Sequence, residues 1–539
     1  MTGFTNREKL LSKMRNGEHL DWDIIVIGGG ITGAGVLREA RRQGYKALLL
    51  EQQDFSWGTS SRSSKMVHGG LRYLAAGDIK LTKESVQERQ RLLKEAPGLV
   101  DPISFYFTFR KGKFPGRIAM KIILTIYDFF AGAQDNRYSN NKELLERFKG
   151  LDENKLQGAS CYTDAMVDDS RLVLRVLQDS IDDGGYALNY TKVEDLLLTN
   201  GQVSGVSIQD SDHPGLIHLN APVVINATGA WADRLRNVVN TETRIRPLRG
   251  SHIIIAKSLF PISDVMTFLH VDDKRGVFVY PWEGTTVIGT TDIDHDGDID
   301  IEAGISDQEV DYLLKAFNSQ FPGKILNRSD VLSTWAGVRP VIAAEKSKDP
   351  SKERRDHAVW SDNGLITVSG GKLTTFRLIA LDALAAAKDN LPQAKVISDD
   401  RVFLTPTITA QSLSPENTSW AQRLLGRYGE KAIELVNESS PDEHHNLNET
   451  EFSLAECRWA IKHEAVVHLD DLLLRRTRLG MCLPNGGTNL YPALKELFLS
   501  NQNWDDERWQ QEVTRYEIIW KKYYSLPSNA LEEVVMKIE

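Results

Sequence analysis

The chain has 539 residues, which is too long for one compact core, so its length predicts two or three domains. A hydrophobic content of 41% and a charged content of 26% describe an ordinary globular protein and exclude a fibrous or wholly disordered one. The net charge of −9 argues against a nucleic-acid partner, because phosphate binding requires a basic surface, although a local basic patch remains compatible with it.

The first predicted element is a βαβ unit. A short apolar run at residues 22–27 predicts a buried strand, a glycine turn occupies 28–33, and a helix is predicted over 34–43. A second strand is predicted over 45–50. Such a unit pairs its strands in parallel with a right-handed crossover, so the sequence predicts an α/β, Rossmann-like domain.

The glycine turn reads GGGITG and fits the GxGxxG pattern of dinucleotide-binding proteins. Gly28 permits a tight turn, Gly30 lets the backbone approach a pyrophosphate, and Gly33 lets the helix and strand pack closely. Glu51 ends the second strand, where its carboxylate can accept hydrogen bonds from the adenosine ribose. The motif alone is weak, but its strand–turn–helix setting predicts a dinucleotide site. It does not separate NAD from FAD.

Three further segments favour FAD. Residues 56–73 are dense in small hydroxyl residues and glycine, which suits a long cofactor that continues past the pyrophosphate. Residues 226–231 and 369–374 follow predicted strands, and the helix start at the second could stabilise negative charge on a reduced flavin. An NAD dehydrogenase would leave these later junctions without a purpose. The residues expected to bind non-covalent FAD are Gly28, Gly30, Gly33, Glu51, Thr59, Ser60, Ser61, Gly69, Gly70, Val193, Ala227, Thr228, Gly229, Gly371, Lys372, Leu373 and Thr374.

Regular structure is also predicted along the rest of the chain. Strands are expected at 222–226, 253–256, 277–280, 286–290 and 365–368. Helices are expected at 83–96, 170–182, 307–317, 374–387, 419–436, 454–467 and 507–524. The polar, proline-containing stretch 391–415 is interpreted as a linker.

We divide the chain into three domains. A discontinuous FAD-binding domain is expected at 20–85, 150–245 and 330–395. A substrate or cap domain is expected at 86–149 and 246–329, and a helical C-terminal domain at 400–539.

Two segments invite a membrane interpretation. The most apolar longer stretch, 116–133, contains Arg117, Lys121 and Asp128, so it should not span a bilayer. It is either a helix buried in a domain core or an interfacial segment that dips into lipid. The basic stretch 475–478 either contacts lipid phosphate or closes the C-terminus of a helix.

The cysteines and the N-terminal region favour the cytoplasm. The 3 cysteines, Cys161, Cys457 and Cys482, form no CxxC pair, so neither a disulfide framework nor a zinc site is expected. Residues 1–20 contain no apolar stretch long enough for a signal sequence. We expect a cytoplasmic protein that is soluble or lies on the inner face of the cell membrane.

Several motifs follow one another in a characteristic order along the chain. They are VIGGGITGAG at 26–35, TSSRSSKMVHGGLRYL at 59–74, NATGAWAD at 226–233, LRGSHIII at 248–255, VFVYPW at 277–282, AGVRP at 336–340 and SGGKLTTFR at 369–377. With the helical tail at 458–480, these motifs closely resemble the FAD-dependent glycerol-3-phosphate dehydrogenase family, within the D-amino-acid-oxidase-like class of flavoproteins. The resemblance spans roughly residues 20–525. It implies a mixed-sheet substrate domain, a helical C-terminal domain and oxidation of sn-glycerol 3-phosphate to dihydroxyacetone phosphate.

The substrate that the resemblance implies carries a dianionic phosphate, which requires cations and additional donors. Arg72 and Tyr73 follow a Gly-Gly turn, Arg339 follows AGV, and Lys372 lies at a helix-opening turn. A single arginine is more often structural, but three cations at glycine-flanked junctions predict phosphate binding by at least two of them.

The reaction moves a hydride from C2 to flavin N5 and a proton from the C2 hydroxyl to a base. Histidine can accept that proton, whereas arginine cannot lose its own. His252 is the first candidate for the base, although a histidine at a strand start is also often structural. His68 is the second, and it would equally suit packing against the flavin. Arg339 is expected beside the reacting centre, where a cation stabilises a developing alkoxide.

The electron acceptor and the rival functions stay open at this stage. We expect a membrane quinone as acceptor, with an O2-using glycerol-3-phosphate oxidase as the alternative. An amine or amino-acid oxidase of the same fold would bind a carboxylate, for which one arginine suffices. An RNA-modifying flavoprotein would require a basic tail, and residues 419–539 contain many acids. The oligomeric state also stays open, with a homodimer as the candidate.

Overall fold

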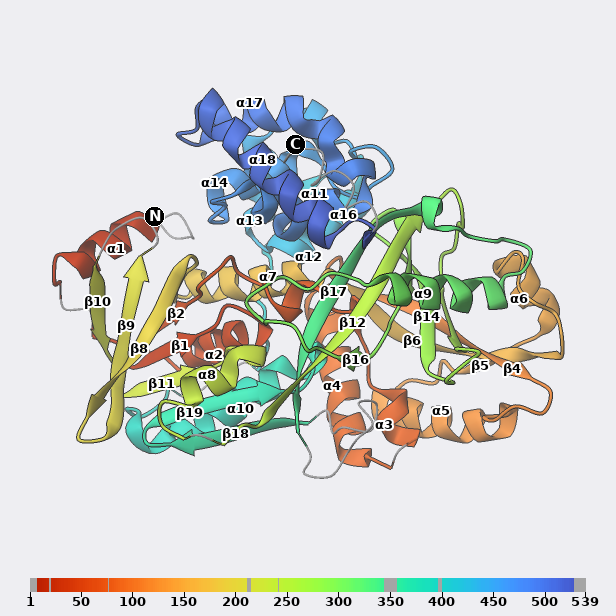
Figure 1. Cartoon of the computed structure of the whole chain (residues 1–539), viewed down its shortest axis with the longest axis horizontal. Coiled ribbons are helices and arrows are strands. Elements are labelled where there is room, and N and C mark those ends of the chain that lie inside the picture. Colours follow the sequence, from red (N-terminus) through yellow and green to blue (C-terminus); the bar gives the residue numbers. More distant parts are fainter. Residues whose placement is uncertain are drawn as a thin grey trace.

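The computed structural model describes residues 7–18, 21–75, 77–210, 215–240, 242–343, 356–395 and 400–527. Figure 1 shows a parallel-sheet layer on the left, a larger sheet on the right, and the C-terminal helices stacked above both. Residues 528–539, which we expected to belong to the helical C-terminal domain, lie outside the described residues.

The first sheet has six strands in the order β18-β19-β11-β1-β2-β7. Their bounds are β1 Ile24–Ile27, β2 Ala47–Leu50, β7 Tyr186–Leu188, β11 Val223–Asn226, β18 His357–Asp362 and β19 Leu365–Gly370. The central strand β1 pairs in parallel with both β2 and β11, as the βαβ pattern predicts. Because both faces of the sheet are covered, its central strands are continuously apolar.

Alternate residues of β1 enter two different cores. Ile24 and Val26 pack with helices α2 (Ile31–Arg42), α7 (Asp169–Asp182) and α10 (Phe376–Ala387). Ile25 and Ile27 pack on the other side with helix α1 and a small antiparallel sheet. Those covering elements are α1 Arg7–Arg15, β8 Thr191–Thr199, β9 Gln202–Asp210 and β10 Leu216–Asn220. The first layer is therefore a doubly covered sheet, whose strand ends carry the glycine junctions.

The second sheet runs β16-β12-β15-β14-β13-β4-β6-β3, with β17 alongside β12 and β5 alongside β6. Its strands are β3 Met66–Val67, β4 Val100–Arg110, β5 Arg137–Ser139, β6 Leu156–Val167, β12 Ile245–Ala256, β13 Val265–Leu269, β14 Gly276–Trp282, β15 Thr285–Gly289, β16 Ile293–Asp294 and β17 Val331–Ile342. Helices α6 (Asn141–Arg147) and α9 (Asp307–Gln320) cover one face. Helices α3 (Leu71–Ala75), α4 (Ile79–Glu95) and α5 (Arg117–Ala131) lie near its lower edge (Figure 1).

This sheet takes in more of the chain than the expected cap ranges. Strands β3, β6 and β17 come from ranges that we assigned to the FAD-binding domain. Of these, β6 pairs with β4 and β17 pairs with β12, which are strands of the expected cap, and β3 pairs with β6. Within this sheet, β17 pairs with β12 along almost their whole lengths, so the two expected domains share one sheet. The division of the chain into three domains therefore stays a proposal.

The C-terminal part is helical, as expected. Its elements are α11 Ala410–Leu413, α12 Thr418–Tyr428, α13 Lys431–Glu438, α14 Leu454–His463, α15 Leu469–Asp471, a π-helical turn at Leu472–Arg476, α16 Leu479–Cys482, α17 Tyr491–Asn501 and α18 Asp506–Tyr523. The single helix predicted over 419–436 is wrong, because Gly429, with φ +61°, separates α12 from α13. The described part of the 391–415 stretch is largely irregular, but it contains the short helix α11.

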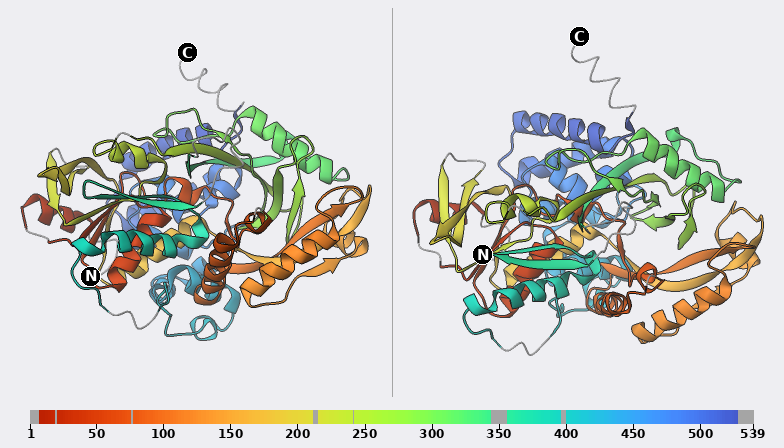
Figure 2. Two further views of the ribbon diagram at one scale, coloured as in Figure 1. Left: turned by 90° about the horizontal axis from the view of Figure 1, so that it is seen from below. Right: turned by 60° about the horizontal axis from the view of Figure 1, so that its bottom comes forward.

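The two segments with a membrane interpretation lie in opposite environments. Helix α5 is buried on one face only, through Met120, Leu124 and Tyr127. On its other face Ile118 and Phe129 are 78% and 80% exposed, so the interpretation as a helix buried in a core is wrong. Figure 2 shows α5 as a rod at the rim of the molecule. Arg475, Arg476 and Arg478 are buried, so contact with lipid phosphate is wrong for them. Arg478 instead donates to the Leu474 carbonyl at 2.6 Å, inside the protein.

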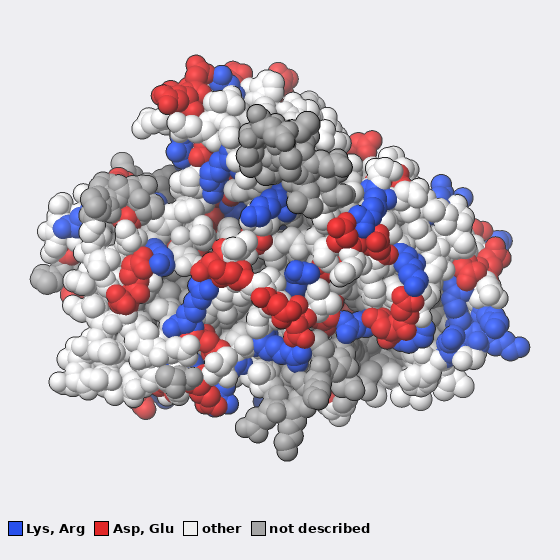
Figure 3. Space-filling view, viewed as in Figure 1, with Lys and Arg blue, Asp and Glu red and all other residues white. Residues whose placement is uncertain are grey.

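The surface face seen in Figure 3 carries interspersed acidic and basic side chains, with Lys and Arg gathered over the far ends of β4 and β5. Among the described residues, no helix is both long enough and apolar enough to cross a bilayer.

Candidate active site

The glycine turn between β1 and α2 has the conformation that the motif predicts. Gly28 has φ +111°, a region that other residues rarely adopt, and a Cβ on Gly33 would overlap the Gly28 carbonyl oxygen. Helix α2 begins directly after Gly30, which has no side chain to cap the helix. The backbone at the start of α2 is therefore not covered by a capping side chain of Gly30, as is typical of helix starts that bind a pyrophosphate.

The acidic residue that follows β2 forms hydrogen bonds with this turn. Glu51 accepts a hydrogen bond from the Gly29 N–H at 2.6 Å and another from the Gln53 N–H at 2.8 Å. Burial raises the pKa of Glu51, and those backbone donors oppose the increase. Ser60 adds a further contact, accepting from the Ile31 N–H at 2.9 Å.

Three glycine junctions that are distant in sequence line one cavity of about 1130 Å³. The turn after β1, the turn after β11 and the turn between β19 and α10 all contribute to its wall. Gly229, Gly370 and Gly371 have φ values of +60°, +80° and +78°, so side chains would strain these turns. The cavity is larger than most drug-sized sites, and its elongated set of backbone-lined turns fits FAD.

Most of the residues expected to bind the cofactor line this cavity. They are Gly28, Gly30, Glu51, Thr59, Ser60, Gly70, Val193, Ala227, Thr228, Gly229, Gly371, Lys372, Leu373 and Thr374. Gly33, Ser61 and Gly69 do not line it. Gly33 serves helix packing, the Ser61 carbonyl accepts from Lys65 Nζ at 2.5 Å, and the Gly69 N–H donates to the Tyr127 hydroxyl at 2.8 Å.

Basic side chains also line this cavity. Arg339 lies 3.5 Å from Asp292 and 3.4 Å from the Thr290 hydroxyl, and Gly250 leaves room for its guanidinium, because a Cβ there would overlap it. Lys372 Nζ lies 3.6 Å from the centroid of the Tyr73 ring. The structure thus brings Arg339, Lys372 and Tyr73 to one cavity.

Arg72 is the remaining predicted phosphate ligand. Its backbone belongs to helix α3, next to Tyr73, but its side chain lies outside what the structure describes. Its expected role in phosphate binding therefore stays a prediction.

The two candidate bases differ in position. His68 lines the cavity directly. His252 is 1% exposed, stacks on Trp335 with ring centroids 4.4 Å apart, and does not line the cavity. Burial lowers the pKa of His252 well below 6.5, and the nearby cations Arg339 and Lys65 lower it further. His252 is therefore neutral at physiological pH.

A serine that we did not single out from the sequence connects His252 to the cavity. Ser64 lines the cavity, and its Oγ lies 3.0 Å from His252 Nε2. The other ring nitrogen, Nδ1, is buried and has no hydrogen-bond partner among the described residues. Ser64 lies within the SSRSSKM run, but nothing in that run distinguishes it from its neighbouring serines. Only the pairing of β12 with the rest of its sheet brings His252 behind it.

The cavity extends to helix α5. Its wall includes Phe114, Pro115, Met120 and Ile123, from the start of α5 and the turn before it. Phe114 is also strongly exposed, beside the exposed lysines Lys111 and Lys113 of that turn. The exposed apolar rim of the molecule and the interior of the cavity are thus continuous.

Comparison with known proteins gives a consistent picture. The family model described as "FAD dependent oxidoreductase" matches residues 23–377, and the model "C-terminal domain of alpha-glycerophosphate oxidase" matches 406–509. The chain is 32% identical to an aerobic glycerol-3-phosphate dehydrogenase of Staphylococcus haemolyticus, over 88% of this chain and 89% of that protein. A Bacillus subtilis protein of the same name is also 32% identical, over 87% and 89%.

A solved structure agrees over nearly the whole length. The glycerol-3-phosphate dehydrogenase from Bacillus halodurans, complexed with FAD, superposes with a TM-score of 0.76 at 27% sequence identity. The superposition covers 97% of this chain and 98% of that chain.

Proposed function

The chain belongs to the FAD-dependent glycerol-3-phosphate dehydrogenase family, and from that premise we propose that it oxidises sn-glycerol 3-phosphate to dihydroxyacetone phosphate. The observation that carries the proposal is the single cavity that extends from the glycine turn after β1 to Arg339 and Lys372. A cofactor site and a cationic pocket in one cavity suit a redox reaction on a small anion.

The residues present fit FAD, because each glycine junction would contact a different part of the cofactor. The start of α2 would hold the pyrophosphate, and Glu51 and Val193, which line the cavity, would hold the adenosine. The Lys372–Thr374 turn before α10 also lines the cavity and would hold the flavin ring. When bound, FAD supplies the acceptor for the hydride that leaves C2 of the substrate.

Arg339 and Lys372 hold the substrate phosphate in this proposal, and Tyr73 and Arg72 complete the pocket. A planar guanidinium and an ammonium together suit a dianion, since they provide charge and several donors. Lys372 also donates to the Ser85 hydroxyl at 2.9 Å, which fixes its direction. Arg339 is near enough to His252 to lower its pKa, so it also lies near the reacting hydroxyl in this proposal.

Ser64 connects the substrate to the buried base. The proton of the C2 hydroxyl passes to Ser64 Oγ while the Ser64 proton moves to His252 Nε2, which are 3.0 Å apart. This requires the tautomer of His252 in which Nδ1 carries the hydrogen. The stacking of His252 on Trp335 keeps the imidazole in place during the transfer. His68, which lines the cavity, is the alternative base.

Helix α5 places the enzyme on a membrane in this proposal, on the inner face of the cell membrane. Ile118, Ile122 and Phe129 are exposed large apolar side chains on one helix, and Arg117 and Lys121 lie beside them. An apolar face flanked by cations is typical of helices that lie in the lipid interface. Because residues at the start of α5 line the cavity, a quinone in the membrane would reach the cofactor from that side.

Anaerobic mixing of the holoenzyme with sn-glycerol 3-phosphate tests the substrate. We expect the flavin absorbance to bleach with this compound and to persist with glycerol or glycine at the same concentration. Bleaching by glycine alone would instead indicate an amino-acid oxidase.

Turnover with different acceptors tests the second half of the reaction. We expect slow turnover in air and fast turnover with a quinone analogue, increased by anionic phospholipid vesicles. One peroxide per substrate oxidised, without any quinone, would instead make the enzyme an oxidase.

A further inference from the structure

The loop between β2 and the 3-10 turn Thr59–Ser61 forms one wall of the cofactor cavity. It touches the glycine turn at three points. Glu51 accepts from the Gly29 N–H at 2.6 Å, the Ser56 N–H donates to the Gly29 carbonyl at 2.9 Å, and Ser60 accepts from the Ile31 N–H at 2.9 Å. The position of this loop, residues 51–61, therefore fixes the shape of the pyrophosphate turn.

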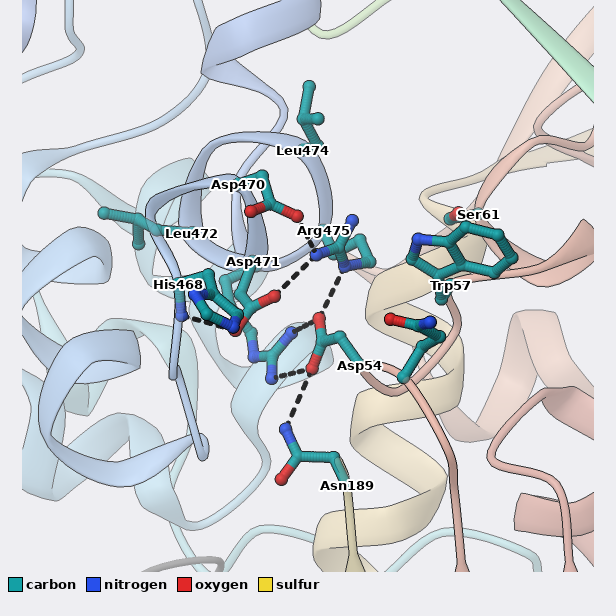
Figure 4. A network of polar contacts seen from close by, with 12 residues as sticks. Asp54, Trp57, Ser61, Asn189, His468, Asp470, Asp471, Leu472, Leu474 and Arg475 are labelled. Carbon is teal, nitrogen blue, oxygen red and sulfur yellow. Dashed lines mark hydrogen bonds and ion pairs between the residues drawn. The ribbon is translucent and has the colours of Figure 1, made fainter. Parts of the chain in front are cut away.

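Asp54 lies in the middle of this loop, with none of its surface exposed. Its carboxylate accepts from Arg475 Nε at 2.5 Å and from both terminal nitrogens of Arg476, at 2.6 and 2.7 Å (Figure 4). Asn189 donates to it at 3.1 Å. Burial alone would raise the pKa of Asp54, but Arg476 and Arg475 bring it down to about 2. Asp54 is therefore a permanent anion held by two arginines.

Both arginines come from the helical C-terminal domain, more than 400 residues further along the chain. They are adjacent in sequence, at the end of the π-helical turn Leu472–Arg476. Arg475 is held from within its own domain by Asp470 at 2.7 Å and Asp471 at 2.6 Å. Arg476 donates to the Glu464 carbonyl at 2.8 Å, at the end of α14. The two guanidinium groups are thus oriented by the helical domain before they meet the loop.

A second contact from the same segment reaches the other end of the loop. Arg478 donates to the Ser61 carbonyl at 3.3 Å and to Asp169 at 2.6 Å. Asp169 in turn accepts from the Ser63 N–H at 2.9 Å and from Lys65 Nζ at 2.9 Å. The basic segment 475–478 therefore holds the cofactor-facing stretch at two places, Asp54 and Ser61.

We propose that the helical C-terminal domain positions the FAD-binding loop, and that Arg475 and Arg476, acting through Asp54, set the affinity of the enzyme for FAD. The two arginines are positioning residues and do not line the cavity. The proposal depends on FAD binding and not on the identity of the substrate or the acceptor. Failure of the substrate proposal would leave it unaffected.

The same domain interface contains a matched control. Arg171 of α7 and Glu464 form a buried ion pair across it, with contacts of 2.5 and 2.8 Å. Glu464 does not contact the loop 51–61 through its side chain, and replacing that side chain leaves its backbone carbonyl to Arg476. Asp54→Asn and Glu464→Gln thus each remove one buried carboxylate charge near Arg476, but only the first removes a group of the loop itself.

The test is the dissociation constant of FAD, measured by flavin fluorescence during reconstitution of the full-length apoprotein. We expect Asp54→Asn to raise this constant at least 10-fold and Glu464→Gln to change it less than 2-fold. The increase in melting temperature caused by saturating FAD should shrink in Asp54→Asn only, since that increase reports ligand affinity. At saturating FAD, the KM for substrate should stay within 2-fold of wild type in both variants.

Equal effects of the two variants on FAD affinity would overturn the proposal, because they would indicate a general loss of interface stability. Unchanged FAD affinity in Asp54→Asn would overturn it as well. If Asp54→Asn does not fold, Arg476→Lys supplies the test, since lysine keeps the charge but cannot form the two-pronged contact. We expect a 3- to 10-fold weaker FAD affinity for this variant, and wild-type affinity would contradict the proposal.

Discussion

A strongly apolar helix of the molecule exposes one face on the surface, whereas a strongly basic segment lies in the interior. Helix α5 exposes Ile118, Ile122 and Phe129, and the segment 475–478 buries three arginines against Asp54, Asp168 and Asp169. Composition alone would predict a buried α5 and an exposed segment 475–478. The difference teaches that burial follows available partners: the arginines have carboxylates to meet inside, and α5 has an apolar face that no described part of the chain covers.

The largest effect in this comparison should come from Arg478. Replacement by alanine leaves Asp168 and Asp169 buried without one of their cations, which should lower the free energy of unfolding by about 3–5 kcal/mol. The shift of the urea unfolding midpoint measures it. Lys121→Ala on α5 is the control, and a surface substitution of this kind should cost less than about 0.5 kcal/mol. Similar costs for both would contradict the contrast between the two segments.

The two candidate bases, the buried His252 and the cavity-lining His68, can be distinguished by kinetics. His252→Gln should lower kcat by about 10²- to 10⁴-fold without reducing FAD content, since general-base catalysis contributes on that scale. Burial lowers the pKa of His252, so the acid limb of the wild-type kcat/KM profile should lie well below pH 6.5. An acid limb near 6.5, abolished in His68→Gln, would assign the base to His68 instead.

The exposed apolar face of α5 can be tested without disturbing the fold. The double variant Ile118→Glu/Ile122→Glu should bind anionic vesicles at least 10-fold more weakly, because burial of each side chain in lipid contributes up to about 1.5–3 kcal/mol. Co-sedimentation with vesicles measures it, and activity with a soluble dye should persist. Ile518→Glu replaces an exposed isoleucine on α18 and should leave vesicle binding unchanged. Equal binding by the two variants would exclude α5 as the lipid-binding face.

The smallest predicted effect is a pH dependence at Asp54. Its pKa is about 2 in the folded protein, below the value of about 3.9 for an unfolded chain. The group therefore contributes stability that is fully present above pH 4 and is lost as the pH falls towards 2. The difference in free energy of unfolding between wild type and Asp54→Asn should shrink by about 1 kcal/mol from pH 7 to pH 3. A difference that is constant with pH would mean that Asp54 does not titrate below its ordinary range.

Much of the cofactor site was predictable, because it depends on local backbone chemistry. A glycine turn between a strand and a helix needs residues such as Gly28 and Gly371, whose positive φ values leave a signature in the sequence. Most of the cofactor residues predicted in this way line the cavity.

The contacts that join distant segments were not predictable in the same way. Asp54 and Arg476 are separated by 422 residues, and no local pattern indicates that they meet. Ser64 stands among several serines, and only the placement of His252 behind it distinguishes it. The long strands β4 and β6 were also missed. Pro102 interrupts the first, and partly exposed positions break the apolar pattern of both.

The central claim is that one cavity joins the cofactor site to a phosphate pocket. Titration of dihydroxyacetone phosphate into the oxidised holoenzyme tests it most directly, with the flavin absorbance spectrum as the readout. We predict a saturable spectral change, with a dissociation constant about 10- to 100-fold higher in Arg339→Met, since a charged hydrogen bond contributes about 1.5–3 kcal/mol. A spectrum that does not respond to the ligand, or an affinity that Arg339→Met leaves unchanged, would contradict the claim.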